Sequence, residues 1–163
     1  MTSTSFSNIL SQASQTEAKS PWNAFLNTLD TKSLSDREAM DLFAKTLASS
    51  RSDWKDSNDN TLLMHMASRG KTNIVKRLIH ELYANVNATN KDGLTALHMA
   101  ARNGQKEVCT ELLDSHADVM KKTKEGATAS MLAHETGHDD VATILKRSET
   151  AKGIFLSGYG QYR

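Results

Sequence analysis

Hydrophobic and polar positions recur along the chain with a period of about 33 residues from residue 60 onward. Three threonines are separated by 34 and 33 residues: Thr61, Thr95 and Thr128. Three glycines keep the same separations: Gly70, Gly104 and Gly137. Branched apolar residues stay in step with both sets: Ile74, Val108, Val141, Leu78, Leu112 and Leu145. A fixed period of this length predicts one supersecondary unit repeated along the chain.

The middle unit predicts two short helices joined by a turn. We expect Thr95 to begin a helix over 95–103, with Leu97 and two alanines on its packing side. Gly104 ends that helix, because glycine enters the left-handed conformation at little cost. A second helix over 107–115 carries Val108, Leu112 and Leu113. Each unit alone would leave an apolar side bare, so the units must stack on one another.

The region before the repeats has a different pattern. Residues 1–20 are polar, with few large apolar side chains, and are expected to be disordered. Two helices are predicted next, one over 21–30 and one over 35–49, the second opened by a Ser35–Glu38 capping box. The second helix should bury one apolar stripe: Ala39, Leu42, Phe43, Thr46 and Leu47. Met residues also fall mostly at helical core spacing, which favours core filling: Met40, Met64, Met66, Met99, Met120 and Met131.

The run from Asp92 to Gly104 resembles the ankyrin-repeat consensus, and so does its continuation to Val119. The resemblance implies an all-α fold, an ankyrin-repeat solenoid of helix–turn–helix units with hairpin-like turn tips, preceded by a helical pair. The expected divisions of the chain are a disordered segment 1–20, a helical pair 21–55 that is a candidate N-terminal capping repeat, three repeats within 56–147 (56–89, 90–122 and 123–147) and a C-terminal tail 148–163.

Several positions depart from the family pattern. The proline that the pattern has after each Thr is replaced by Leu62, Ala96 and Ala129. The histidine of the pattern occurs only as His98, which could be a catalytic base or a metal ligand but which the resemblance makes a structural residue bonded to neighbouring turns. Between Leu78 and Val86 the first repeat carries one extra residue, so its loop should be reshaped.

Composition and charge exclude several classes of function. The net charge is +1 with both signs interspersed, which gives no general attraction to nucleic acid or membrane. Lys121, Lys122 and Lys124 form a basic turn that could touch an acidic partner or nucleic acid, and we favour a solvated hairpin tip. No apolar stretch is long enough to span a bilayer. With one cysteine the chain forms no internal disulfide, which suits a reducing cytosol. We expect a cytoplasmic protein that is a monomer.

Two motifs suggest catalysis without supporting it. His134-Glu135-Thr136-Gly137-His138 matches the zinc-peptidase pattern, which would make a zinc hydrolase if both histidines lay on one face of a continuous helix. Gly137 falls where the repeat breaks between helices, so we expect a repeat turn, no metal and no cofactor. Cys109 could be a nucleophile, but it lies directly after Val108 on an apolar helix face and should be a small buried hydrophobe.

The resemblance implies a non-enzymatic module that binds another protein, as an adaptor or inhibitor, through the turn tips and the inner-helix palm. Placed in the family register, the candidate partner-binding residues are Ser57, Asn58, Asn60, Lys91, Asp92, Leu94, Lys124 and Glu125 on the tips, and Ser68, Arg69, Arg102, Asn103, Glu135 and Thr136 on the palm. Arg102 is the best single candidate, because arginine is enriched at binding hot spots and this one is central. An alternative in the same fold is a bacterial ankyrin effector delivered into the cytosol of a eukaryotic host cell.

Overall fold

The computed structural model describes residues 21–31, 34–49 and 54–158. The segment 1–20 and the last residues of the expected tail, 159–163, lie outside the described residues. The described part of the chain holds eight helices and no strand, so the all-α prediction is confirmed. None of these helices is both long and apolar enough to cross a bilayer. The chain forms two compact units, Met1–Trp54 and Lys55–Arg163, and each is described by itself.

Two helices make up the described part of the first unit. They are α2 (Pro21–Thr31) and α3 (Asp36–Ser49). Ser35 begins α3 as predicted, because its backbone N–H donates to the Glu38 carboxylate at 2.9 Å while the Glu38 N–H donates to Ser35 Oγ at 3.4 Å. Three aromatic rings form the core, with centroids 5.7 to 6.1 Å apart: Trp22, Phe25 and Phe43. The predicted stripe of α3 packs with them, and its Leu47 is half-buried.

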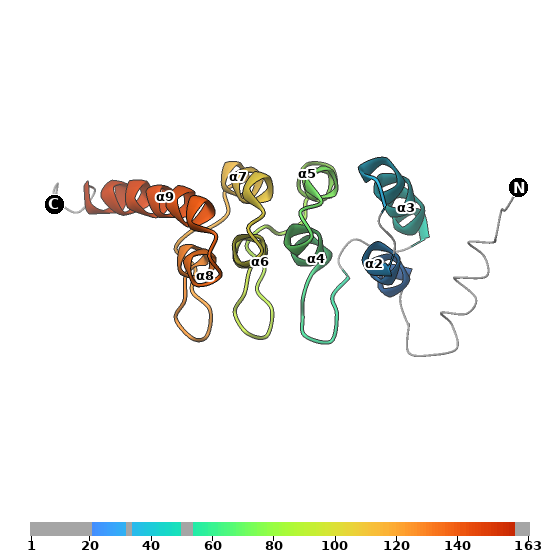
Figure 1. The fold of residues 1–163 in the computed structure, drawn as a ribbon, viewed down its shortest axis with the longest axis horizontal. Coiled ribbons are helices and arrows are strands. Elements are labelled where there is room, and N and C mark those ends of the chain that lie inside the picture. The colour runs from blue at the N-terminus through green and yellow to red at the C-terminus, as the bar shows by residue number, and fades with distance from the viewer. Residues whose placement is uncertain (1–20, 32–33, 50–53, 159–163) are drawn as a thin grey trace, which may run out of the picture. The chain divides into compact units, whose positions relative to one another are not determined.

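The second unit consists of three helix pairs in sequence. The pairs are α4 (Leu62–Ser68) with α5 (Thr72–His80), α6 (Ala96–Arg102) with α7 (Lys106–Asp114), and α8 (Ala129–Glu135) with α9 (Asp139–Gly158). The first helices form one row, in which α6 contacts both α4 and α8. The second helices form another row, in which α7 contacts α5 and α9, and a hairpin-like loop precedes each helix of the first row (Figure 1).

The residues that recur in the sequence begin and end the helices of the first row. Thr61 and Thr95 are the N-caps of α4 and α6, and each hydroxyl accepts the N–H of the residue three positions on. Gly104 comes directly after the C-cap of α6 with φ 68°, which confirms the left-handed turn expected there. A side chain at Gly104 would also collide with a neighbour, since an added Cβ would lie 2.5 Å from His138 Nδ1.

Small and branched apolar residues fill the core of the second unit. The side chains facing between successive pairs are fully buried, among them Leu63, Leu97, Ala100, Val108 and Leu112. The prediction that methionines fill the core holds for Met64 and Met66, which are at most 1% exposed. It is wrong for Met120 and Met131, which are 43% and 57% exposed. Met131 lies on the side of α8 that no further repeat covers within the described part of the second unit. It therefore stays in solvent, although the same position in an earlier repeat is buried.

One loop and one boundary differ from those of a regular repeat. The predicted extra residue is at the end of α5, where the Ala84 N–H reaches back six residues to the Leu78 carbonyl at 2.9 Å. The matching bond in the next repeat spans five residues, from Ala117 to Leu112. At the other end, the boundary expected after residue 147 falls inside α9, which continues to Gly158. Lys152 on this continuation donates to Asp118 at 2.8 Å and ties it to the preceding repeat.

Candidate protein-binding surface

Three tight turns, called here tip 1 (56–60), tip 2 (90–94) and tip 3 (123–127), project from the row of α4, α6 and α8 (Figure 1). Each is closed by a backbone hydrogen bond of 2.9 to 3.0 Å between its first and last residues. The first side chain of each tip also accepts backbone N–H groups inside the turn: Asp56 from Asn58 and Asn60, Asn90 from Asp92 and Leu94, and Thr123 from Ala127. The tips are therefore held in shape by their own side chains.

Neighbouring tips are bonded to one another. The Lys91 backbone N–H donates to the Asn58 carbonyl at 3.1 Å, and its Nζ donates to the Ser57 carbonyl at 2.6 Å. The Lys124 N–H donates to the Asp92 carbonyl at 2.9 Å. Gly93 allows this approach, because a Cβ there would lie 3.0 Å from the Lys124 nitrogen. A partner that binds the row meets a preformed edge, which lowers the entropy cost of binding.

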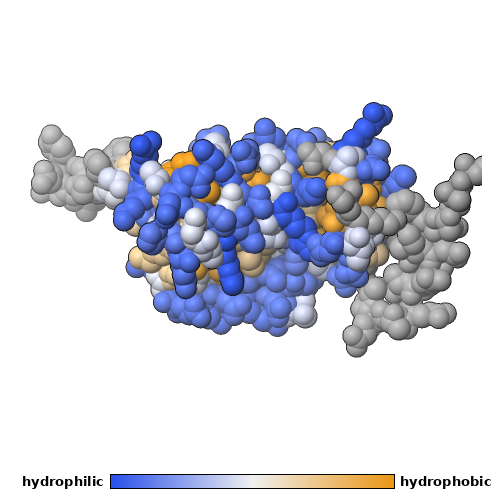
Figure 2. Space-filling model, in the orientation of Figure 1, coloured by the Kyte–Doolittle hydropathy of each residue, from blue (hydrophilic) through white to orange (hydrophobic). Residues whose placement is uncertain are grey.

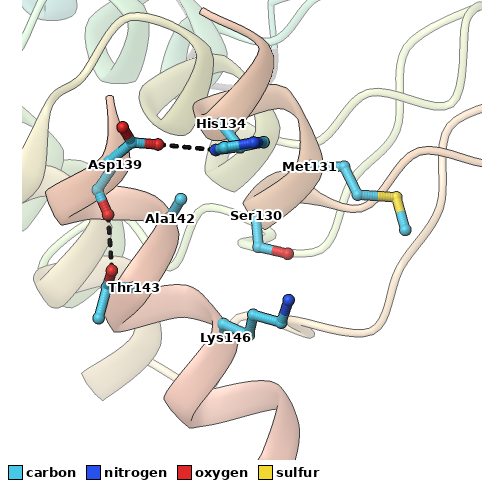
Figure 3. Close-up of a pocket in the computed structure, with 7 residues that line it drawn as sticks. All are labelled: Ser130, Met131, His134, Asp139, Ala142, Thr143 and Lys146. Carbon is cyan, nitrogen blue, oxygen red and sulfur yellow. Dashed lines mark hydrogen bonds and ion pairs between the residues drawn. The ribbon is translucent and has the colours of Figure 1, made fainter. Parts of the chain in front are cut away.

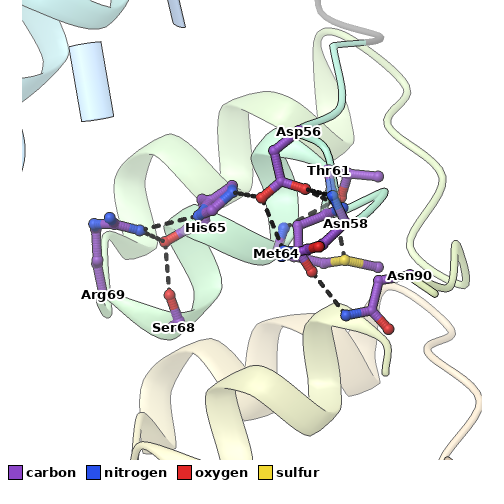
Figure 4. A network of polar contacts seen from close by, with 9 residues as sticks. Asp56, Asn58, Thr61, Met64, His65, Ser68, Arg69 and Asn90 are labelled. Atoms are coloured by element: carbon purple, nitrogen blue, oxygen red, sulfur yellow. Dashed lines mark hydrogen bonds and ion pairs between the residues drawn. The ribbon is translucent and has the colours of Figure 1, made fainter. Parts of the chain in front are cut away.

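Polar side chains link tip 1 to α4 (Figure 4). Asp56 accepts from the Asn60 amide at 2.8 Å and contacts His65 Nε2 at 3.0 Å. Burial alone would raise the pKa of Asp56, but the hydrogen bonds from Asn60, Asn58 and His65 outweigh it and lower that pKa. The Arg69 guanidinium and the Ser68 hydroxyl both donate to the His65 carbonyl, at 3.0 and 2.9 Å. The network fixes the first tip against its helix.

The predicted palm residues occupy the same place in every repeat. Ser68, Arg102 and Glu135 are the last residues of α4, α6 and α8, and the C-cap residue comes directly after each: Arg69, Asn103 and Thr136. The four in the second and third repeats are exposed, whereas Ser68 and Arg69 are half-buried. At about 1.5 Å rise per residue, each lies about 12 to 14 Å, measured along its helix, from the end of the tip that precedes it.

The predicted tip residues are mostly in solvent. Ser57, Asn58, Lys91, Asp92, Lys124 and Glu125 are exposed. Asn60 and Leu94 are half-buried, and both are bonded to Asn90, Asn60 through its side chain and Leu94 through its backbone N–H. Viewed from one side, the edge formed by the tips is hydrophilic (Figure 2). Its exposed groups carry both charges, so this edge is suited to polar contacts of mixed sign.

His98 is a buried side chain of α6, 1% exposed. Its Nδ1 accepts the Thr95 backbone N–H at 3.2 Å and lies 2.8 Å from the Thr95 hydroxyl, which leaves the proton on Nε2. Burial lowers the pKa of His98, and the backbone carbonyls of Ala127 and Lys121 near tip 3 oppose that shift. The imidazole is thus neutral at neutral pH, and His98 is a buried structural residue and not an exposed base.

The two histidines of the zinc-peptidase pattern lie on different elements. His134 belongs to the last turn of α8, and its Nδ1 contacts Asp139 at 2.7 Å. His138 comes after Gly137, whose φ is 81°, and its ring packs against Gly104 of the preceding repeat. The pattern requires both rings on one face of a continuous helix. Across the described residues, no group of three His, Cys, Asp or Glu side chains is placed to hold a metal ion.

Cys109 lies in α7 and is 1% exposed. Burial raises the pKa of its thiol to about 12, with Asp140 and Glu107 adding to the shift. A thiol with this pKa is protonated at neutral pH and is a poor nucleophile. The prediction that Cys109 is a small buried hydrophobe is therefore confirmed.

Comparison with protein families agrees with this architecture. A family model described as ankyrin repeats in three copies matches residues 35–123 and, in a second alignment, 63–154. The chain belongs to the ankyrin-repeat family. No curated protein matches it significantly. Ankyrin repeats are generally protein–protein interaction modules and are typically non-enzymatic.

Three exposed residues of the repeats were not among the site residues predicted from the sequence. Tyr83, after α5, is 86% exposed with φ 52°, and His116 takes the same left-handed conformation in the next repeat, with φ 63°. The sequence signal that could have indicated this shared conformation is their matching position, since each directly precedes the alanine that follows the second helix of its repeat, Ala84 or Ala117. A third residue, Met131, is on a hollow face of the last repeat lined by both α8 and α9.

Proposed function

We propose that this ankyrin-repeat chain is a non-enzymatic adaptor or inhibitor that binds a partner protein across its tips and its palm. The bonded row of tips supports the proposal most directly, because it holds exposed charges of both signs in a fixed order beside the palm. Arg102 lies centrally in this surface and is exposed. Among the described residues its side chain has no hydrogen bond or ion pair, so a partner carboxylate could bind it without breaking a bond inside the chain.

The residues proposed for binding are those predicted from the repeat register. Lys91, Leu94 and Arg102 lie on tip 2 and α6, in the middle of the three repeats. A complex of ordinary size buries about 800 Å² on each partner, which three repeats can supply. In such an interface a few residues near the centre contribute most of the binding free energy. Arg102→Ala should therefore weaken binding by at least about tenfold, or about 1.4 kcal/mol.

The test is affinity capture from the source cell with matched variants. The test variant is Lys91→Ala/Leu94→Ala/Arg102→Ala. The control, Lys106→Ala/Arg147→Ala, also removes two positive charges, but from exposed sites on α7 and α9. Circular dichroism melts first establish that all forms fold alike. A protein captured by the wild type and the control, and lost with the test variant, supports the proposal. The same proteins captured by all three forms would refute it.

The cellular setting is proposed on different grounds. We place the binding in the cytosol, because the single cysteine is buried and the fold needs no disulfide. The effector alternative depends on delivery signals in the flanking segments, of which 1–20 and 159–163 lie outside the described residues. A translocation reporter fused to the chain tests it, and absence of reporter signal in host cells under conditions that deliver a known effector would rule it out.

A further inference from the structure

The last repeat has a polar end face where the other repeats have an apolar one. In α5 and α7 the residues that pack toward the next repeat include Val75, Ile79 and Cys109, all at most 9% exposed. The same positions of α9 hold Ala142 and Lys146, offset by 33 residues from Cys109 and Leu113. In α8, Ser130 and His134 likewise stand where α6 has Leu97 and Ala101. Within the described part of the second unit no further helix packs on this side.

The end face is defined here by the residues that line its hollow of about 250 Å³: Ser130, Met131, His134, Asp139, Ala142, Thr143 and Lys146 (Figure 3). The four from α9 are spaced i, i+3, i+4 and i+7, so they share one side of that helix. Asp139 and Lys146 are the first and last of these four residues and are separated by about 10 Å of helix rise. Small or short side chains, Ala142 and Thr143, lie between them.

This charge pattern is complementary to itself. If a second α9 lay antiparallel across the first, with a two-fold axis between Ala142 and Thr143, each residue would face the one equally far on the other side of that axis. Asp139 of each copy would then face Lys146 of the other, and Ala142 would face Thr143. A two-fold interface uses the same patch on both subunits and makes every contact twice. The short central side chains would let the two helices approach closely.

We propose that the end face binds a second copy of this chain, with the two α9 helices antiparallel and two Asp139–Lys146 ion pairs across the interface. The Asp139 carboxylate is already held in place by His134 Nδ1 at 2.7 Å. Met131, which is 57% exposed beside the hollow, is an apolar group that the second copy covers. An unrelated partner would need the same alternation of charges, whereas a second copy carries it by symmetry. This proposal differs from the monomer that we expect from the sequence.

The experiment measures the dimer dissociation constant of the full chain by analytical ultracentrifugation over a range of concentrations. Asp139→Lys and Lys146→Glu each turn both ion pairs into like-charge contacts and should raise the dissociation constant at least about tenfold. The double variant Asp139→Lys/Lys146→Glu restores opposite charges and should return it to within about threefold of the wild type. The matched control is Asp140→Lys, which makes the same charge change at the next residue of α9, about 100° around the helix.

Three results would overturn the proposal. One is a wild-type chain that stays monomeric at the highest concentration that remains soluble. Another is a dimer weakened equally by Asp139→Lys and by Asp140→Lys, which would indicate a general effect of charge. The third is a double variant no stronger than the single ones. Melting curves of every variant distinguish loss of the dimer from loss of the fold. None of the substituted residues belongs to the tips or the palm, so this result is independent of the proposed binding function.

Discussion

Tyr83 is held in a backbone conformation that disfavours it. Its φ of 52° is in the left-handed region, and the Ala84 N–H after it closes the end of α5 on the Leu78 carbonyl. A residue with a Cβ pays about 1 to 2 kcal/mol there, whereas glycine does not. Glycine loses more backbone entropy on folding, by about 0.5 to 1 kcal/mol. With 86% of Tyr83 in solvent, little burial is lost on its removal.

Tyr83→Gly should therefore stabilise the second unit by up to about 1.5 kcal/mol, with a central value of about 0.8 kcal/mol. For a unit of this size, about 1 kcal/mol corresponds to a rise in melting temperature of about 4 °C. Urea unfolding followed by circular dichroism gives the free energy of unfolding, and a thermal melt gives the temperature. The free energy and the melting temperature are both measured on the full chain. Wild type and variant are compared at the same protein concentration.

Tyr83→Ala separates the two effects of the substitution. Alanine also lacks the aromatic ring but keeps the Cβ that strains this position, so this variant should be no more stable than the wild type. The difference in stability between the two variants isolates the cost of the Cβ at this position and should favour glycine by at least about 0.5 kcal/mol. Equal stability of Tyr83→Gly and Tyr83→Ala would mean that the left-handed conformation costs nothing here, and would refute the prediction.

Two further predictions concern the inner helices. Thr128, which precedes α8, has φ −87° and ψ 166°, and these angles suit a residue that comes before proline. Ala129→Pro should therefore stabilise the chain by up to about 1 kcal/mol. A clear fall in melting temperature would contradict the assigned register of the third repeat. Because burial lowers the pKa of His98 below its usual 6.5, the unfolded chain binds more protons, and the free energy of unfolding should fall as pH drops from about 7 toward 5. His98→Gln should flatten that dependence in urea titrations at several pH values, and an unchanged slope would show that other groups cause it.

The regular part of the fold could be predicted from sequence because its signals are local. Thr95 caps α6 and Gly104 turns the chain after it, and both effects depend on residues within a few positions. Stacking is then required, since each helix pair has an apolar side to bury. The Ser35–Glu38 box predicted the start of α3 for the same reason. The repeat spacing also separated His134 from His138, which a five-residue pattern alone would have joined.

Features that depend on the end of the stack could not be predicted in the same way. Met131 occupies the position of the buried His98, yet it is exposed, because a residue at this position is buried only when another repeat packs against it. The repeat length gave no reason for α9 to continue beyond residue 147. That continuation is held by contacts distant in sequence, from Ser130 to Glu149 at 2.7 Å and from Lys152 to Asp118. The repeat period predicts burial and helix length for interior repeats, but not for the last repeat, which has a neighbouring repeat on one side alone within the described part of the chain.

The sequence treated the palm residues of the three repeats as equivalent, and the structure separates them. In the first repeat Arg69 and Ser68 are bonded to the His65 carbonyl, so a partner that used them would have to replace bonds already made. An exchange of hydrogen bonds of this kind yields little net free energy. In the second and third repeats Arg102 and Glu135 are exposed and end their helices without such a network. We therefore expect the binding free energy to be concentrated in the second and third repeats, with the first acting mainly to hold tip 2 in place through Asn58, Ser57 and Asn60.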